Sequence, residues 1–256
     1  MGKIISTANQ KGGVGKTTTA VNLSTAMAAT QKKVLLIDLD PQGNAGTGVG
    51  YQKNKEDFGV YELLRKNTPL SQCVHKTLIP NLFILPSSEN LVGAEVELVS
   101  ELERETVLKK QLSSHGFDFI YIDCPPALGL LTVNALVASD GVVVPMQCEY
   151  YSLEGLSQIL KTIEIVQRGL NPSLELSGVV LTMFDNRNRL SLQVEADVRE
   201  HLGDKVYKTV IPRNVRVSEA PSFGKPAMIY DFKCAGAQAY IKLASEILKK
   251  EEGFCV

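Results

Sequence analysis

The chain has 256 residues, of which 44% are hydrophobic and 21% are charged, so it can bury a large core. This composition excludes a disordered chain, a fibre and a small disulfide-stapled protein, and we expect a single domain over residues 1–256. The 27 basic and 28 acidic residues give a net charge of −1, which excludes a uniformly basic nucleic-acid coat but not a local basic patch.

Short apolar runs of strand length alternate with helical segments along the chain. The expected strands are residues 3–8, 33–38, 82–85, 119–123, 141–145, 178–183 and 206–211, and the expected helices are 17–31, 152–168 and about 235–250. In the helix 152–168 six apolar residues share one face, with Ser152 expected at the N-cap and Gly169 just beyond the C-terminus. This alternation predicts an α/β fold with a doubly wound, mostly parallel sheet flanked by helices.

The cysteines and histidines give no sign of a disulfide framework or a local metal motif. The five cysteines are scattered without a CxxC pair, which is typical of free thiols in a reducing cytoplasm, and the three histidines lie far apart. No stretch approaches the roughly 20 apolar residues of a membrane span, and the N-terminus has no long apolar region. We therefore expect a cytoplasmic protein with no membrane contact.

A glycine-rich loop, QKGGVGKTT, lies at residues 10–18 between the first expected strand and the first expected helix. A bound phosphate chain needs inward-pointing backbone N–H groups, a helix N-terminus, a lysine and a hydroxyl for Mg²⁺. We expect Lys16 to reach the β- and γ-phosphates and Thr17 to bind the metal, while the glycines allow close backbone approach. The usual pattern GxxxxGK[ST] is broken because Gln10 replaces its first glycine, and a second lysine, Lys11, stands inside the loop.

Acidic residues close two of the expected strands. Asp38 and Asp40 end the run KVLLIDLD, and Asp123 ends FIYID. An acidic strand end is common and on its own marks only a turn. Beside a phosphate loop, at the carboxyl edge of a parallel sheet, such carboxylates are expected to bind Mg²⁺ through water and to orient an attacking water.

Four motifs in order, KGGVGKTT, LLIDLDPQGN, IDCPPALG and PRNVRVSEAPSFGKP, closely resemble those of the ParA/Soj partition ATPases. These are P-loop NTPases of the deviant Walker A (MinD/ParA) class, and the resemblance covers nearly the whole chain. It implies ATP and Mg²⁺ as cofactors, a homodimer with ATP, and nonspecific binding to double-stranded DNA. It further implies chromosome or plasmid segregation on the nucleoid with a ParB-type centromere-binding protein, a replication initiator being a further candidate partner.

The resemblance also gives roles to individual residues. Lys11 is similar to a lysine that crosses the dimer to the other subunit's phosphates, and Glu149 resembles a glutamate that reaches the nucleotide across it. Asp40 matches the residue needed for hydrolysis, and residues 40–47 and 123–129 look like two switch segments. By this resemblance the catalytic residues are Lys11, Lys16 and Asp40, the nucleotide-binding residues are Lys11, Gly12, Gly13, Val14, Gly15, Lys16, Thr17, Thr18, Glu149, Pro212, Arg213 and Asn214, and the Mg²⁺ ligands, mostly through water, are Thr17, Asp40 and Asp123.

Charge is unevenly distributed along the chain. Residues 187–233 carry nine basic and six acidic side chains, whereas residues 89–105 carry six glutamates and one arginine. Solvated surface charge is the plain interpretation of the basic stretch. Arg189 and Arg216 match DNA-contacting positions in ParA/Soj proteins, and Lys233 adds a third candidate, although many relatives are more arginine-rich around it.

Other functions within the same fold stay open. A MinD-like, membrane-associated division regulator needs a basic amphipathic C-terminal helix, but residues 247–256 are short and partly acidic, and Cys255 is not in a prenylation motif. An iron–sulfur ATPase needs cysteines that meet at a dimer axis, and Cys124 has no evident partner. A scaffold that coats DNA or regulates replication, with incidental turnover, is a further alternative. Because the chain starts at its first strand, we expect no N-terminal helix-turn-helix.

Overall fold

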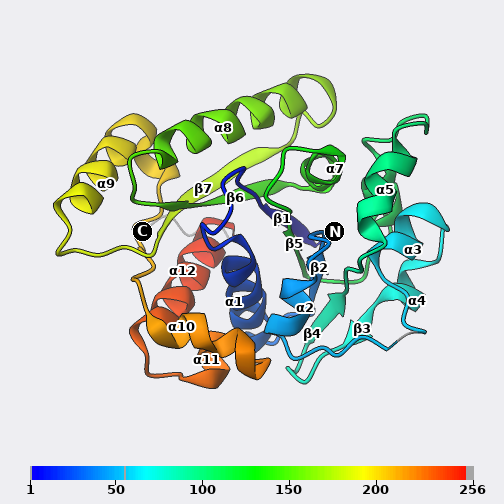
Figure 1. Ribbon diagram of the computed structural model, residues 1–256, viewed down its shortest axis with the longest axis horizontal. Coiled ribbons are helices and arrows are strands. Elements are labelled where there is room, and N and C mark those ends of the chain that lie inside the picture. The colour runs from blue at the N-terminus through cyan, green and yellow to red at the C-terminus, as the bar shows by residue number, and fades with distance from the viewer. Residues whose placement is uncertain (1, 55, 252–256) are drawn as a thin grey trace.

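The computed structural model describes residues 2–54 and 56–251. In this part of the chain seven strands form one sheet in the order β3-β4-β2-β5-β1-β6-β7 (Figure 1). Neighbouring strands are parallel, except that the short β3 runs antiparallel to β4. The strands are β1 (Lys3–Thr7), β2 (Val34–Asp38), β3 (His75–Lys76), β4 (Leu82–Leu85), β5 (Phe119–Asp123), β6 (Gly141–Gln147) and β7 (Glu175–Thr182).

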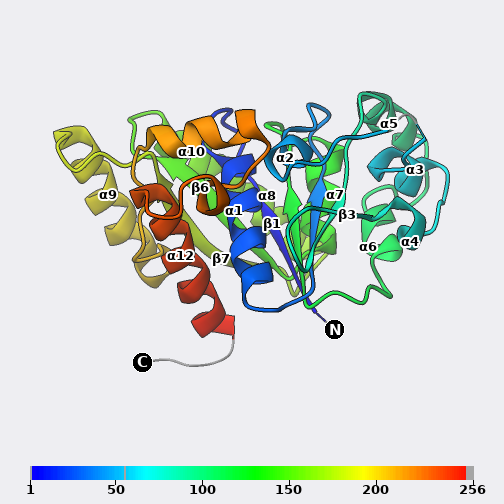
Figure 2. The ribbon, with the colours of Figure 1, turned by 90° about the horizontal axis from the view of Figure 1, so that it is seen from below.

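Helices cover both faces of the sheet (Figures 1 and 2). Helices α1, α2 and α12 pack on one face, and α3 to α9 pack on the other. The helices are α1 (Lys16–Ala29), α2 (Asn44–Gly48), α3 (Val60–Arg65), α4 (Leu70–Cys73), α5 (Leu91–Leu98), α6 (Val107–Gln111), α7 (Leu130–Ala138), α8 (Ser152–Gly169), α9 (Arg189–Leu202), α10 (Val215–Glu219), α11 (Ala227–Tyr230) and α12 (Ala235–Glu251), with 3₁₀ turns at Gly203–Lys205 and Ala220–Phe223.

The central strands are apolar along their whole length because both of their faces are buried. In β2, Val34 and Leu36 pack against the α1 and α12 layer, whereas Leu35 and Ile37 pack against the opposite layer. All four side chains are fully buried. A continuous apolar run, rather than strict alternation, is expected for a strand covered by helices on both sides. The predicted fold class is confirmed.

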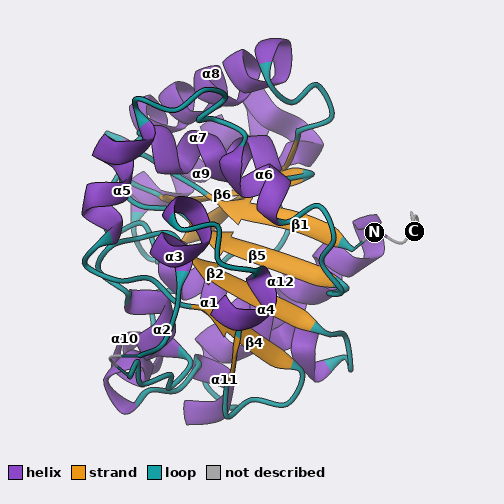
Figure 3. Cartoon of the chain, turned by 90° about the vertical axis from the view of Figure 1, so that its right-hand side faces the viewer, coloured by secondary structure: helices purple, strands orange, loops and turns teal. Residues whose placement is uncertain are grey.

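The strand register places three polar residues side by side at the carboxyl edge of the sheet. Thr7 of β1 pairs with Asp123 of β5, and Asp123 pairs with Asp38 of β2. Figure 3 shows these parallel strands running together between the helix layers. This edge is where an open α/β sheet places its ligands.

The strand expected at residues 206–211 is wrong. This segment lies beside β7 and donates only two hydrogen bonds to it, from the backbone N–H groups of Tyr207 (3.0 Å) and Ile211 (2.8 Å). The two residues after Tyr207 instead donate their N–H groups to the carboxylate of Glu246 on α12. Because the N–H of Thr209, which lies between the two residues bonded to β7, bonds to Glu246 instead, the ladder is interrupted and an eighth strand does not form.

The caps expected for the helix 152–168 are also wrong. Ser152 is the first residue of α8 rather than its N-cap, which is Tyr151, and its hydroxyl is buried without a hydrogen-bond partner in the described structure. Gly169 is the last helical residue, and Leu170 follows as the C-cap. The predicted apolar face is buried at four positions, whereas Leu153 is partly exposed.

The C-terminal tail, with Cys255, lies in residues 252–256, outside the described residues. Across the described ranges, no helix is both long and apolar enough to span a bilayer. The four described cysteines are free thiols. Burial raises the pKa of Cys148 to about 12 and that of Cys73 to about 11.

Candidate nucleotide-binding site

The glycine-rich loop between β1 and α1 adopts a backbone that only glycine takes without strain. Gly13 and Gly15 have φ angles of +74° and +88°, in the left-handed region. Gly15 is the N-cap of α1, which begins at Lys16. The loop therefore ends at a helix N-terminus, where the helix dipole and unpaired N–H groups favour an anion.

Side chains from two neighbouring strands bind the carbonyl groups of this loop. Gln147, the last residue of β6, donates to the carbonyl of Gly13 at 3.0 Å. Thr182, the last residue of β7, donates to the carbonyl of Val14 at 2.8 Å. Neither residue was expected from the sequence, although each ends a strand at the edge where ligands bind. They tie the loop to the carboxyl ends of β6 and β7.

The amide groups of the loop remain available. No acceptor among the described residues binds the backbone N–H groups of Gly12, Gly13 or Gly15. Gly12 and Gly13 are exposed, and Thr17 and Thr18 are half-buried on the first turn of α1. Unpaired donors converging on one turn form a cradle for phosphate oxygens.

Lys16 lies inside the site rather than at the surface. It is only 6% exposed, and its ammonium donates to the carbonyl of Lys11 at 3.1 Å. Burial lowers its pKa, while the negative charge of Asp123 opposes that shift. The carboxylate and the ammonium therefore occupy one buried polar space beneath the loop.

Asp123 is the least satisfied carboxylate in the described structure. It is fully buried, and neither of its oxygens has a hydrogen-bond partner there. Burial raises its pKa, as does the charge of Asp38, whereas the nearby Thr17 hydroxyl and Lys16 ammonium lower it. A bare buried carboxylate beside a hydroxyl provides the hard oxygen donors that Mg²⁺ prefers. The residues present thus fit a magnesium ion.

The same region offers few protein ligands for a metal. No group of three His, Cys, Asp or Glu side chains that could hold a metal is found in the described ranges. A cation here would complete its coordination with phosphate oxygens and water, as Mg²⁺ usually does.

Asp38 and Asp40 separate into different roles. Asp38 is fully buried, and its carboxylate accepts N–H bonds from Asp40 (3.2 Å), Ala45 (2.9 Å) and Gly46 (3.1 Å). Burial raises its pKa to about 7. Asp38 therefore stabilises the fold of the segment 40–47 through its backbone N–H groups. Asp40 is half-buried, and one of its oxygens accepts from the N–H of Gln42 at 3.0 Å.

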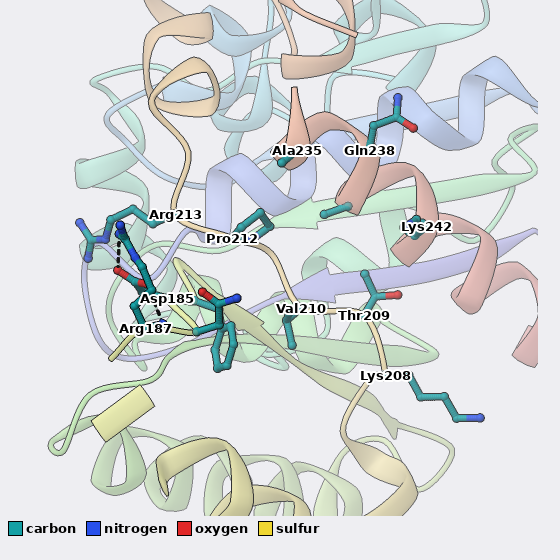
Figure 4. Close-up of a pocket in the computed structure, with 13 residues that line it drawn as sticks. Asp185, Arg187, Lys208, Thr209, Val210, Pro212, Arg213, Ala235, Gln238 and Lys242 are labelled. Atoms are coloured by element: carbon teal, nitrogen blue, oxygen red, sulfur yellow. Dashed lines mark hydrogen bonds and ion pairs between the residues drawn. The ribbon is translucent and has the colours of Figure 1, made fainter. Parts of the chain in front are cut away.

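A groove of about 800 Å³ lies between the segment after β7, residues 208–213 and the first turns of α12 (Figure 4). Phe184 and Asp185, just after β7, line it together with Pro212 and Arg213. Asp185 binds the Arg187 guanidinium at 2.9 and 3.0 Å, which lowers its pKa to about 2. The size and mixed lining suit a planar heterocycle.

The loop expected to hold a base only partly lines this groove. Pro212 and Arg213 border it, whereas the Asn214 side chain accepts from the N–H of Val217 at 3.3 Å and caps α10. Phe184 was not expected from sequence. Its place two residues after the carboxyl end of β7 is the signal that could have found it.

The three expected DNA-contacting residues are all exposed. Arg216 on α10 pairs with Glu219 (3.1 Å) and with Asp231 (3.7 Å), which lies two residues before Lys233. Arg189 is the first residue of α9. The structure thus joins the segments of Arg216 and Lys233 directly and places Arg189 on a separate helix.

A family model described as an AAA domain matches residues 2–176. The chain is 53% identical over 253 residues to the chromosome partitioning protein ParA of Caulobacter vibrioides, covering 97% of this chain and 95% of that protein. It is 53% identical over 249 residues to the sporulation initiation inhibitor protein Soj of Bacillus subtilis, covering 96% and 98%.

A solved structure with a bound nucleotide is similar to this chain. It is titled cobyrinic acid a,c-diamide synthase from Mycobacterium smegmatis with bound ADP and magnesium. It superposes with a TM-score of 0.86 at 36% identity, over 98% of this chain and 96% of that one. With these relatives, the resemblance noted in the four motifs is confirmed, and the chain belongs to the ParA/Soj family of chromosome-partitioning ATPases.

Proposed function

We propose that this protein binds ATP with Mg²⁺, dimerises in the ATP state, and hydrolyses ATP to ADP and phosphate. The observation that carries the proposal is the buried Asp123 carboxylate, which lies without a hydrogen-bond partner in the described structure beside Lys16 and Thr17. Such an arrangement is costly unless a cation and a phosphate chain complete it. The loop amides of residues 12–18 then hold the triphosphate, and the groove lined by Phe184, Pro212 and Arg213 holds the base.

In this proposal each residue positions or stabilises charge. When bound, Mg²⁺ neutralises negative charge that develops on the phosphates. Thr17 and Asp123 would hold it, the latter mostly through water. Lys16 contacts the terminal phosphates, and Asp40 orients the attacking water. Lys11 of a second copy stabilises the transition state in trans.

The proposal extends to DNA and a protein partner. Arg189, Arg216 and Lys233 are proposed to bind DNA phosphates without reading sequence, so that a dimer in the ATP state associates with the nucleoid. Each chain offers few such contacts, and dimerisation doubles them. A ParB-type protein is proposed to stimulate hydrolysis and so release the dimer during chromosome or plasmid segregation. The 53% sequence identity of this chain to Caulobacter ParA and to Bacillus Soj supports this role.

Binding to random-sequence DNA tests whether the bound nucleotide controls association with DNA. We expect retention with ATP but not with ADP or without nucleotide, and a salt slope of about −0.9 per phosphate contacted. Lys16→Ala is the control, because it removes the buried lysine and with it the nucleotide response. Equal retention in all three nucleotide states would contradict the proposal.

A further inference from the structure

Helix α5 has apolar side chains on both its inner and its outer face. Leu91, Ala94 and Leu98 are fully buried in the core. On the outside, Val92 and Val96 are 62% and 75% exposed, and the stripe continues to Val99 and Leu102, which are 57% and 94% exposed. A surface helix normally presents polar residues to water, and a continuous apolar stripe marks an interaction site. We call Val92, Val96, Val99 and Leu102 the α5 stripe.

The surroundings of the α5 stripe are acidic. Residues 89–105 contain six glutamates and only Arg104 as a cation. Arg65 of α3 pairs with Glu97 at 2.8 Å and with Glu101, and Lys110 of α6 pairs with Glu103. With Arg104, these three cations leave the region a net charge of −3 against the six glutamates. The rim is therefore negative even after its own ion pairs are counted, and it disfavours DNA.

Helix α5 also contacts one switch segment. The Glu95 carboxylate lies so close to Gly129 that a Cβ there would sit 2.0 Å from it, and it accepts from the N–H of Leu131 at 3.4 Å. Gly129 ends the segment 123–129, which starts at the buried Asp123. A shift of α5 would therefore move the segment that carries Asp123.

The residues that precede α5 lie beside the other switch segment, residues 40–47. Residues 86–90, which lead from β4 into the helix, line a groove of about 540 Å³ together with Asp38, Gln42 and Thr47. One switch segment therefore contacts α5 at Glu95, and the other shares a groove with the residues that lead into the helix. Figure 1 places α5 at the edge of the molecule beside α3 and α7, on the side away from α9 and α12.

We infer that the α5 stripe is the docking surface for a cationic amphipathic segment of the protein partner that stimulates hydrolysis. This inference rests on the proposed function. The partner segment needs apolar side chains at helical or strand spacing to cover the valines, and lysines or arginines at its flanks to meet the acidic rim. Docking acts on the site through Glu95 and Gly129. DNA is bound elsewhere, by the basic residues of α9, α10 and the segment before α12.

The test measures steady-state ATP hydrolysis with DNA, without and with the ParB-type protein of the same organism. We expect Val96→Asp to weaken the stimulation about tenfold, because it places an extra negative charge in the apolar centre of the contact. Its basal turnover and ATP-dependent DNA binding should equal those of the wild type, since Val96 is on the surface. Ile165→Asp on α8, where Ile165 is 69% exposed, is the matched control and should be stimulated normally.

Each alternative outcome is decisive. Equal stimulation of Val96→Asp and wild type overturns the inference. Loss of ATP-dependent DNA binding in Val96→Asp, but not in Ile165→Asp, places the stripe in a contact between copies of this chain and also overturns it. If wild type binds DNA only with ATP but its hydrolysis is not stimulated by the partner, the inference fails, while the proposed ATP-dependent DNA binding is supported. If wild type shows no nucleotide-dependent DNA binding, the proposed function itself fails.

Discussion

Lys11 and Glu149 form an ion pair within one chain, with the ammonium and a carboxylate oxygen 2.8 Å apart. The two residues belong to different segments, the glycine-rich loop and the turn that follows β6. Both were expected to act across a dimer, yet in the single chain the two side chains bind each other. Their side chains are 33% and 51% exposed, so the pair contributes at most about 1 kcal/mol to folding stability. Dimerisation can therefore exchange it at low cost.

Lys11→Ala should bind ATP nearly as well as wild type but hydrolyse it roughly 10³–10⁵ times more slowly. Binding survives because Lys16 and the loop amides stay in place, whereas the transition state is deprived of the cation supplied by the other subunit. Nucleotide affinity by calorimetry and single-turnover hydrolysis measure the two effects separately.

Glu149→Gln is the matched control for Lys11→Ala, because it breaks the same ion pair but leaves the lysine in place. It should keep far more activity than Lys11→Ala. If both variants lose hydrolysis equally, the ion pair itself matters, and the trans role of Lys11 is wrong.

Asp40→Ala should bind ATP, dimerise and stall before hydrolysis. The Asp40 side chain is half-buried, and its hydrogen bond with the N–H of Gln42 is local, so the substitution leaves the glycine-rich loop and Asp123 intact. Size-exclusion chromatography with ATP, followed by phosphate release, measures both steps. Turnover at the wild-type rate would remove the water-positioning role given to this residue.

Unlike Asp40→Ala, Asp38→Ala should mainly decrease the stability of the fold. Three backbone N–H groups are left without their acceptor, at least two of them buried, and we expect a decrease of about 3 kcal/mol in the free energy of unfolding. Urea denaturation without nucleotide is the measurement, with Asp40→Ala as the comparison at less than about 1 kcal/mol. Similar decreases in both variants would contradict the division of roles between these two carboxylates.

The sequence predicted six of the seven strands found in the described residues, the glycine-rich loop and the acidic strand ends, because each rests on local pattern. Continuous apolar runs mark strands buried on both faces, and glycines mark the left-handed turns at Gly13 and Gly15. What it missed depends on contacts between distant segments. Asp38 and Asp40 look equivalent in sequence, and only the fold of residues 40–47 directs one of them to backbone amides. Likewise, Glu246 prevents a strand from a position 38 residues beyond Lys208 in the chain.

Arg216→Glu should abolish binding to random-sequence DNA in the ATP state while ATP hydrolysis without DNA persists. Arg216 is exposed and far from the glycine-rich loop in sequence, and in the free protein it pairs with Glu219 and Asp231. DNA phosphates therefore compete with these carboxylates, and the milder Arg216→Ala should reduce the salt slope by about 0.9 for each phosphate that the dimer no longer binds. Lys161→Glu, a charge reversal at an exposed position on α8, is the control and should bind as wild type. If both reversals weaken DNA binding equally, net charge rather than a defined patch drives the interaction.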